Sequence, residues 1–174
     1  EDLETLAAYY RDRGYLDAQV VKHELDVAPN GKDLTLRIQV QEGARYTVGM
    51  VSWTGNTVFD DNRIRPLIRL RAGEAFSESA YEASTGALHE LYNDAGYIHF
   101  NATPRRSLRG QTVDLTYAFE EGSAARVHQI RIVGNTKTQD KVILREFLVL
   151  PGDTFDRSRL MRSIRELYAL GLFE

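Results

Sequence analysis

The sequence predicts an α+β protein built from tandem β-α-α-β-β modules, each with a three-stranded mixed sheet that carries two helices on one face. The first observation behind this prediction is an internal repeat. The sequence Gly-Asn-Thr at residues 55–57 recurs at 134–136, and a Gly-Glu/Asp-x-Phe motif at 73–76 recurs at 152–155. Both recurrences have one spacing, because 134 − 55 = 79 and 152 − 73 = 79. A repeat of this length is large enough to form a small core of its own.

Two further patterns recur around that repeat. Alternating apolar residues closed by Glu-Gly occupy 34–43 and again 113–122, and a Tyr-x-x-x-Gly helix end occupies 10–14 and again 92–96. A shortened form of the helix end, Tyr-x-x-Gly, occupies 168–171. The chain is therefore predicted to have three parts, which are the C-terminal half of one module at 1–43, a complete module at 44–122 and the N-terminal half of a third module at 123–174.

The composition limits the class of protein. The net charge of −3 and a pI near 5.9 argue against a dedicated partner with a phosphate backbone. The arginine clusters at 63–71 and 105–109 are accordingly predicted to be solvated faces. The chain has no cysteine, which excludes disulfides and thiol chemistry, and no apolar segment long enough to span a bilayer. Because it starts inside a helical pattern and stops where a strand is due, we expect a segment of a longer protein whose targeting signals lie elsewhere.

The first part is predicted to be a helix followed by a hairpin. Apolar residues recur at helical spacing over residues 1–13, and Gly14 supplies a left-handed stop. Strand-forming residues follow at 15–27 and 34–40, on either side of a Pro-Asn-Gly turn at 29–31. Since residues 34–40 alternate apolar with polar side chains, the hairpin is predicted to bury one face.

The complete module is predicted to contain a strand at 46–54, a short helix from about residue 60 to 70, a longer helix, and strands at 97–103 and 112–120. Pro66 limits how regular the short helix can be. Ser77 is the expected N-cap of the longer helix, which ends at Gly96. Gly86 in the middle of that helix is attributed to a close approach of the short helix, with a hinge as the alternative.

The third part repeats the start of the module. A strand is predicted from Val127, a helix at 138–149, and a last helix capped by Asp156. The two strands that would complete the sheet are missing from this part. Residues 123–174 are therefore expected to be poorly stable alone or to recruit a substitute strand.

No constellation of reactive groups predicts an enzyme, a metal site or a cofactor site. The histidines at 23, 89, 99 and 128 lack ligand spacing, and no second histidine completes a zinc helix. The Gly-Asn-Thr sequence is not followed by the Gly-Lys-Ser/Thr of a phosphate loop, so we interpret it as a turn from strand to helix. Trp53 is assigned to the core rather than to a stacking platform.

The sequence offers backbone groups as its candidate binding site. A three-stranded sheet has open edges, whose N–H and C=O groups can pair with another extended chain and tolerate many side chains. The candidate edge is the strand at 97–103, bounded by Pro104 because proline cannot donate a hydrogen bond. The alternative, in which neighbouring groups merely blunt this edge, stays open.

Three segments carry a resemblance to a known family. They are residues 144–147 (LREF), 150–156 (LPGDTFD) and 163–173 (SIRELYALGLF). Together with the module order and the Gly-Asn-Thr turns, these segments resemble the POTRA (polypeptide-transport-associated) domains of the BamA family of outer-membrane barrel-assembly proteins. The resemblance covers the whole chain. It departs from the family pattern at residues 65–67, in the first helix of the complete module.

The resemblance implies a periplasmic arm, without enzymatic activity, attached to a C-terminal membrane barrel of the same chain. Such an arm would receive unfolded outer-membrane proteins, partly by strand addition, and would dock accessory assembly lipoproteins. No cofactor and no nucleic acid is implied. The family's sheet order places the second strand at an edge. The implied strand-binding residues are Tyr97, Ile98, His99, Phe100 and Asn101 in the complete module, and Tyr15, Leu16, Asp17 and Ala18 in the first part.

Two alternatives stay open. A related POTRA protein that exports a partner or assembles autotransporters would have the same modules, and the barrel and the total number of modules would separate it. A nucleic-acid-binding α+β module belongs to a different class. It would require a basic face or a Gly-x-x-Gly loop, and a salt-sensitive affinity for oligonucleotides.

Overall fold

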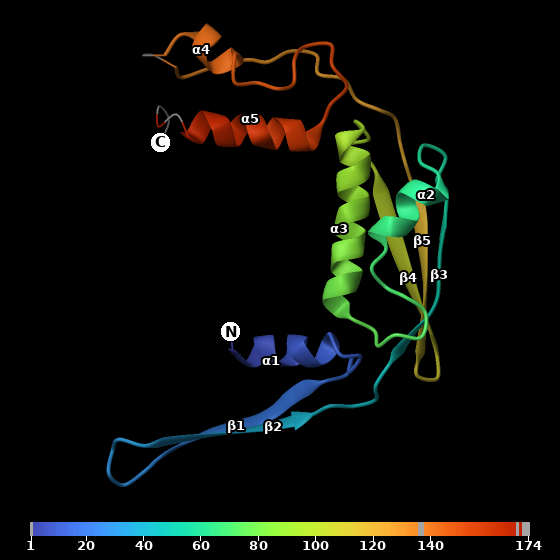
Figure 1. Ribbon diagram of the computed structural model, residues 1–174. Helices are drawn as coiled ribbons and strands as arrows, with labels where there is room; N and C mark the ends of the chain where they lie inside the picture. The colour runs from blue at the N-terminus through green and yellow to red at the C-terminus, as the bar shows by residue number, and fades with distance from the viewer. Residues whose placement is uncertain (1, 136–137, 170, 172–174) are drawn as a thin grey trace. The chain divides into compact units, whose positions relative to one another are not determined.

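The computed structural model describes residues 2–135, 138–169 and 171, and it confirms an α+β protein (Figure 1). Its elements are α1 (Asp2–Arg11), β1 (Gln19–Val27), β2 (Leu34–Gln41), β3 (Thr47–Thr54), α2 (Asp61–Ile64), a 3₁₀ helix η1 (Arg65–Leu67), α3 (Glu78–Asp94), β4 (Asn101–Arg109), β5 (Thr112–Glu120), α4 (Asp140–Leu144) and α5 (Arg157–Ala169). Thr136, Leu170, Leu172 and Phe173, which belong to the repeat motifs, lie outside the described residues.

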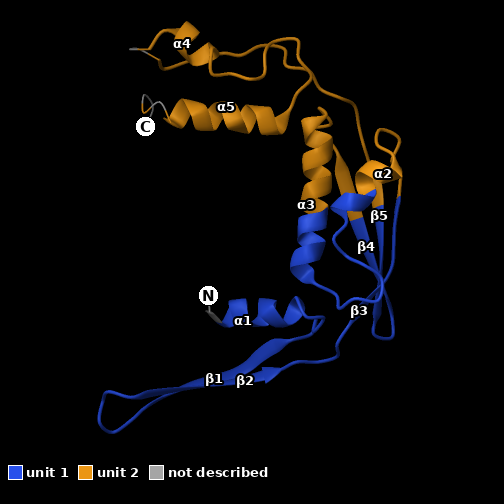
Figure 2. Cartoon of the chain, in the orientation of Figure 1, with its two compact units in different colours: residues 1–53, 65–84, 104–117 blue, residues 54–64, 85–103, 118–174 orange. Residues whose placement is uncertain are grey.

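The chain divides into two compact units (Figure 2). Unit 1 comprises residues 1–53, 65–84 and 104–117, and unit 2 comprises residues 54–64, 85–103 and 118–174. The helix α3 and the strands β4 and β5 are each divided between the two units. Each unit therefore combines a terminal part of the chain with a portion of the central sheet.

The central sheet has three strands in the order β3-β5-β4 and is mixed, as predicted. Because β4 and β5 are joined only by Gly110 and Gln111, they form an antiparallel hairpin, and Gly110 has the positive φ (61°) that such a turn requires. The side chains of β5 alternate between buried and half-buried along its whole length. This alternation places one face of the sheet in the core.

The main core cluster of unit 1 is aliphatic with one phenylalanine, and Tyr117 is buried in the same unit. The buried members of the cluster are Val48, Leu70, Phe76, Val113 and Leu115. The polar residue Ser84 is also buried in this unit. Its hydroxyl accepts a hydrogen bond from Arg69 N (2.8 Å) and donates one to Ala80 O (2.6 Å). Both hydrogen bonds satisfy the hydroxyl, so its burial carries no desolvation penalty from an unpaired group.

The core of unit 2 is aromatic. The ring of Tyr92 stacks on Phe100 with 3.8 Å between centroids and meets Phe59 edge-on at 4.9 Å. The Tyr92 hydroxyl donates to Glu121 (2.7 Å), which also accepts from Thr57 N (2.9 Å). Burial opposes ionisation of Glu121, but the hydrogen bonds from Thr57 and Tyr92 outweigh it and lower the pKa of this carboxyl. The Gly-Asn-Thr turn is thereby tied to the residue that follows β5.

Contacts of the first repeat recur in the second. Ser163 on α5 accepts from Leu148 N (2.7 Å), as Ser84 accepts on α3, and the two serines are 79 residues apart (163 − 84 = 79). The side-chain amides of Asn56 and Asn135 each donate to the carbonyl three residues later (3.1 and 2.9 Å). The sequence repeat therefore corresponds to repeated local structure.

The two short helices are shorter than predicted. α2 gives way to η1 at Arg65, and α4 stops at Leu144, whereas we expected them to reach residues 70 and 149. Pro66 does not explain the early end, because Arg145 occupies the aligned position beyond α4 (66 + 79 = 145). At both places the chain leaves the helix and then buries an apolar residue, Leu70 or Val149. Core packing thus overrides helix propensity.

The long helices begin as predicted. Ser77 accepts from Ala80 N (3.1 Å) at the start of α3, and Asp156 accepts from Arg159 N (2.8 Å) at the start of α5, so both N-caps are confirmed. The explanation proposed for Gly86 is wrong. A Cβ atom placed on Gly86 would meet no atom within 4 Å, so no neighbouring helix requires glycine there.

The first hairpin pairs β1 with β2 from Gln19 opposite Gln41 to Val27 opposite Leu34, with one irregularity between Val20 and Lys22. The prediction that one of its faces is buried is wrong. Its apolar residues are largely exposed, including Leu34 at 63%. The reason is that this sheet has only two strands within the described residues, and α1 is much shorter than α3. A two-stranded sheet lacks the cover that buries the corresponding face of β5.

The strand predicted from Val127 is also wrong. Residues 124–135 contain only an isolated bridge, between Arg126 and Thr154, and no strand. A β-strand requires hydrogen bonds to a neighbouring strand, and no hairpin lies beside this segment in the described residues. None of the described helices is long and apolar enough to cross a membrane.

Candidate functional site

The candidate binding edge of the central sheet is β4 (Figure 1). The strand β5 lies on one side of β4, and no strand of the described residues lies on the other. Ala102 is buried and Pro104 is half-buried, whereas all residues from Arg105 to Arg109 are exposed. The strand continues through Pro104, which an edge strand tolerates when the proline nitrogen points away from its neighbour. The expectation that Pro104 bounds the edge is therefore wrong.

The predicted start of the edge is also wrong. Tyr97, Ile98, His99 and Phe100 lie in a turn between α3 and β4, and only Asn101 belongs to the strand. The turn is closed by hydrogen bonds from Tyr97 N to Tyr92 O (2.9 Å) and from Phe100 N to Tyr97 O (3.0 Å). The buried Phe100 ring stacks on Tyr92 of α3, which keeps this turn packed against the helix. The strand β4 therefore begins only at Asn101. Ile98 and His99 are exposed beside the start of β4.

The candidate residues of the first part are displaced in the same way. Tyr15, Leu16, Asp17 and Ala18 form a turn, and β1 begins only at Gln19. The turn includes a hydrogen bond from Ala18 N to Tyr15 O (3.1 Å), and Ala18 is buried. The carboxylate of Asp17 accepts a hydrogen bond from the Tyr46 hydroxyl (2.9 Å). These residues therefore join the first part to the complete module rather than extending β1.

Sequence reasoning missed most of the edge, the residues from Pro104 to Arg109. A signal for them was present in the hairpin. The alternating strand at 112–120 has nine residues, and a two-residue turn precedes it, so its antiparallel partner must be the nine residues 101–109. The prediction stopped at Pro104 because proline was interpreted as a boundary instead of as an edge residue.

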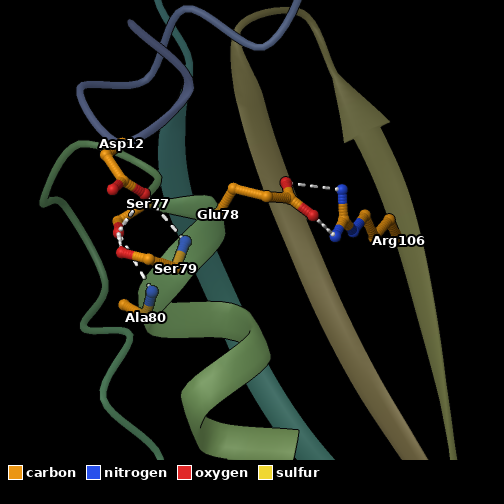
Figure 3. Close-up of polar contacts among 6 residues, drawn as sticks. All are labelled: Asp12, Ser77, Glu78, Ser79, Ala80 and Arg106. Atoms are coloured by element: carbon orange, nitrogen blue, oxygen red, sulfur yellow. Dashed lines mark hydrogen bonds and ion pairs between the residues drawn. The ribbon is translucent and has the colours of Figure 1, made fainter. Parts of the chain in front are cut away.

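A second feature is the junction between the first part and the complete module, which lies within unit 1 (Figure 3). Asp12, just after α1, accepts hydrogen bonds from Ser79 N (2.7 Å) and from the Ser77 hydroxyl (3.1 Å) at the start of α3. Burial raises the pKa of Asp12, but the bonds from Ser79 and Ser77 outweigh burial and lower it. An ionised Asp12 is thus an N-terminal cap supplied by the preceding part of the chain.

The first turn of α3 also holds the β4 edge (Figure 3). Arg106 on β4 donates two hydrogen bonds to the Glu78 carboxylate (3.1 and 2.5 Å). The guanidinium of Arg106 lies 3.9 Å from the centroid of the Tyr81 ring and 5.2 Å from that of Phe76. A bidentate ion pair that also stacks on aromatic rings restricts the side chain more than a simple surface pair does. The β4 edge is therefore anchored to the helix that Asp12 caps.

The same junction recurs within unit 2. Asp94 accepts from Ser158 N (2.9 Å) at the start of α5, as Asp12 does at the start of α3. The carbonyl of Gly14 accepts from Tyr46 N (2.7 Å), and that of Gly96 accepts from Ala125 N (2.8 Å). Sequence reasoning missed both aspartates. Their common signal was an Asp two residues before the glycine that ends each helix.

The site thus contains an open strand edge presented by a sheet and anchored to capped helices. In the part of the chain that the structure describes, no group of three or more His, Asp or Glu side chains is placed to hold a metal ion. What the arrangement can do chemically is pair its backbone with another extended chain. These features define a class of α+β scaffold built from tandem modules.

The family model described as "POTRA: Surface antigen variable number repeat" matches residues 46–122 and 125–174. The chain therefore belongs to the POTRA family, which is a scaffold family and not an enzyme family. The family match covers most of the complete module and of the third part.

Two relatives and one solved structure cover nearly all of the chain. The outer membrane protein assembly factor BamA of Neorickettsia risticii is 32% identical over an alignment of 178 residues, which covers 99% of this chain and 23% of that protein. BamA of Neisseria meningitidis serogroup B is 28% identical over 177 residues, covering 100% of this chain and 22% of that protein. The crystal structure of Haemophilus influenzae BamA POTRA3-5 superimposes with a TM-score of 0.78 at 23% identity, covering 99% of this chain and 69% of that one.

These comparisons confirm the resemblance to POTRA domains of the BamA family. The chain spans about a fifth of the length of the curated relatives it matches. The match to the Haemophilus influenzae structure establishes the fold. As POTRA domains of this family, the modules belong to the periplasmic part of an outer-membrane protein.

Proposed function

We propose that this chain is part of the periplasmic arm of an outer-membrane protein assembly machine and that it receives unfolded outer-membrane proteins as strands added to the edge of β4. The observation that carries the proposal is the sheet order β3-β5-β4, which leaves one side of β4 without a strand partner among the described residues. Two relatives that match the chain are named outer membrane protein assembly factors. In our proposal the arm accepts polypeptides of different sequences.

Strand addition suits that requirement, because the main chain provides the hydrogen bonds and side chains add selectivity. The residues we assign to this edge run from Asn101 to Arg109. We expect Ile98 and His99, which are exposed beside the start of β4, to contact the end of an added strand. In the first part, β1 pairs with β2 alone in the described residues and offers a second, less protected edge.

Docking of accessory assembly lipoproteins and attachment to a membrane barrel of the same protein are further parts of the proposal. They rest on family membership. POTRA arms that export a partner or assemble autotransporters would share the β4 edge, so the chemistry proposed for the edge does not depend on that choice.

The test is a backbone amide NMR titration of the 174-residue chain with a peptide from an outer-membrane barrel strand. We expect shifts concentrated on β4, with small changes on α3. The matched variants are Leu108→Pro and Leu108→Ala. Leu108 is exposed and lies an even number of residues from Pro104, so its N–H points the same way as the Pro104 nitrogen. Leu108→Pro should weaken binding by removing an outward donor, whereas Leu108→Ala should not.

Two outcomes would contradict the proposal. Shifts confined to the helices would place the binding site on the other face of the module. Equal affinities of the proline and alanine variants would mean that the outward backbone of β4 does not pair with the peptide.

A further inference from the structure

A groove of about 500 Å³ lies in unit 1 between β3 and the residues 65–72, which comprise η1 and the segment after it. Its apolar lining includes Val51 and Trp53 from β3 and Ile68 from the opposite wall, and its charged lining is Arg65 and Arg71. Both arginines are exposed, whereas Val51 and Ile68 also pack against the buried core of this unit. The groove therefore has an apolar floor and a cationic rim.

The groove exists because the outer side of β3 is covered only at its start. Gly73 N donates to Val48 O and Val48 N donates to Glu74 O, each at 2.8 Å, and Thr47 bridges to Ala75. In the described residues no further strand pairs with that side of β3. The rest of the strand, with Trp53 near its end, borders the groove instead.

The charge of the groove is unbalanced within the described residues. Both charged residues of its lining, Arg65 and Arg71, are cationic. The guanidinium of Arg65 lies 5.2 Å from the Trp53 ring centroid, which holds a positive charge over an aromatic face beside the groove. Arg69 is also exposed in the same run, although the chain as a whole carries a net charge of −3. A local cationic surface on an acidic protein favours an acidic partner.

We infer that this groove is a second polypeptide-binding surface, which takes an acidic extended segment with an apolar side chain on the groove floor and carboxylates against Arg65 and Arg71. The apolar lining favours a polypeptide over a phosphate backbone, because only a polypeptide supplies both an aliphatic or aromatic side chain and carboxylates at strand spacing. The inference concerns β3 and does not depend on strand addition at β4.

The test uses the fluorescence of Trp53, which is the single tryptophan of the chain and so reports on this groove. The 174-residue chain is titrated with a synthetic peptide of alternating Asp and Leu, and separately with one of alternating Lys and Leu. We expect the acidic peptide to change Trp53 emission saturably and the basic peptide to leave it unchanged. Added salt should weaken the acidic peptide's binding.

Matched variants separate the groove from net charge. The double variant Arg65→Glu/Arg71→Glu should weaken the binding of the acidic peptide by about tenfold or more, since two favourable charge contacts become repulsive. The double variant Lys22→Glu/Lys32→Glu, in the exposed first hairpin, makes the same change in net charge and should leave the affinity within about twofold, because neither residue lines the groove. Arg65→Lys keeps the charge and should retain most of the affinity, which guards against a loss caused by misfolding.

Three outcomes would overturn the inference. The first is an equal loss in the Lys22→Glu/Lys32→Glu variant, and the second is a Trp53 response to anionic lipid vesicles but not to the peptide. The third is no Trp53 response while the amides of β4 shift with a barrel-strand peptide, a result that would leave the proposal for β4 intact. A Trp53 response without shifts on β4 would support the groove and count against the β4 edge.

Discussion

At the scale of single residues, two glycines of the complete module have opposite structural roles. Gly55, which follows β3, has φ +86°, and a Cβ atom there would lie against the carbonyl oxygen of Phe119. Gly86, in the middle of α3, has open space where its Cβ would be. The first glycine is required by the close approach of β5 and by its conformation, while the second only weakens its helix.

Alanine substitutions at these two glycines should therefore change the free energy of unfolding in opposite directions. Gly86→Ala should raise the free energy of unfolding by about 1 kcal/mol, because alanine has the higher helix propensity. Gly55→Ala should lower it by about 1–3 kcal/mol, because alanine is strained at positive φ and the backbone oxygen of Phe119 cannot move aside cheaply. Urea denaturation followed by circular dichroism measures both effects. Destabilisation by both variants would show that Gly86 does have a neighbour that requires glycine.

At the scale of elements, the same kind of junction between consecutive parts of the chain occurs twice. Asp12 caps α3 in unit 1 and Asp94 caps α5 in unit 2, so each long helix begins on a carboxylate from the preceding part of the chain. The helix dipole and the free N–H groups of the first turn both favour an ionised carboxylate there. We propose that these caps restrict the angle between consecutive modules.

Removing the cap should loosen the junction of unit 1. Asp12→Ala should cost about 0.5–2 kcal/mol and should broaden the distance distribution between spin labels on α1 and α3. Asp12→Asn is the matched control, because asparagine keeps the hydrogen-bond acceptor of the cap and lacks only the negative charge that the helix dipole favours. The pKa of Asp12 is below its ordinary 3.8, so the advantage of aspartate over asparagine at this position should be complete above about pH 4 and disappear as the pH falls through the lowered pKa. A pH-independent difference, or an unchanged distribution in the alanine variant, would contradict this role.

At the scale of the whole molecule, the three parts of the chain differ in how completely they are covered. The central sheet buries one face of β5, whereas the first hairpin is exposed and residues 124–135 form no strand. A helix without a sheet to cover exposes its backbone to solvent through local opening. We therefore expect α5 to open more readily than α3.

Native-state amide hydrogen exchange tests this expectation in the 174-residue chain. Amides in the middle of α3, around Leu88, should exchange with the free energy of global unfolding. Amides in the middle of α5, around Ile164, should exchange at least about tenfold faster, because local opening suffices to expose them. Equal protection of the two helices would mean that the third part has found a substitute for its missing strands.

The sequence by itself determined the repeat, the helix and strand types of the complete module and the family. These features depend on local patterns, such as the alternation over residues 112–120 and the caps at Ser77 and Asp156, which the structure reproduces. Spacing alone also predicted the three-stranded sheet, because a β-α-α-β-β unit has few ways to bury its apolar face.

Only the tertiary structure decided where the edge begins, how far the short helices run and which apolar faces are covered. Phe100 has the pattern of a strand residue, yet it stacks on Tyr92 and delays β4 to Asn101. Likewise, β2 alternates as well as β5 does, but Leu34 and Leu36 remain exposed because no further element lies over them in the described residues. Local patterns indicate which structure a residue prefers, whereas burial depends on packing partners distant in sequence. Phe100 has such a partner in Tyr92, and Leu34 and Leu36 have no covering element in the described residues.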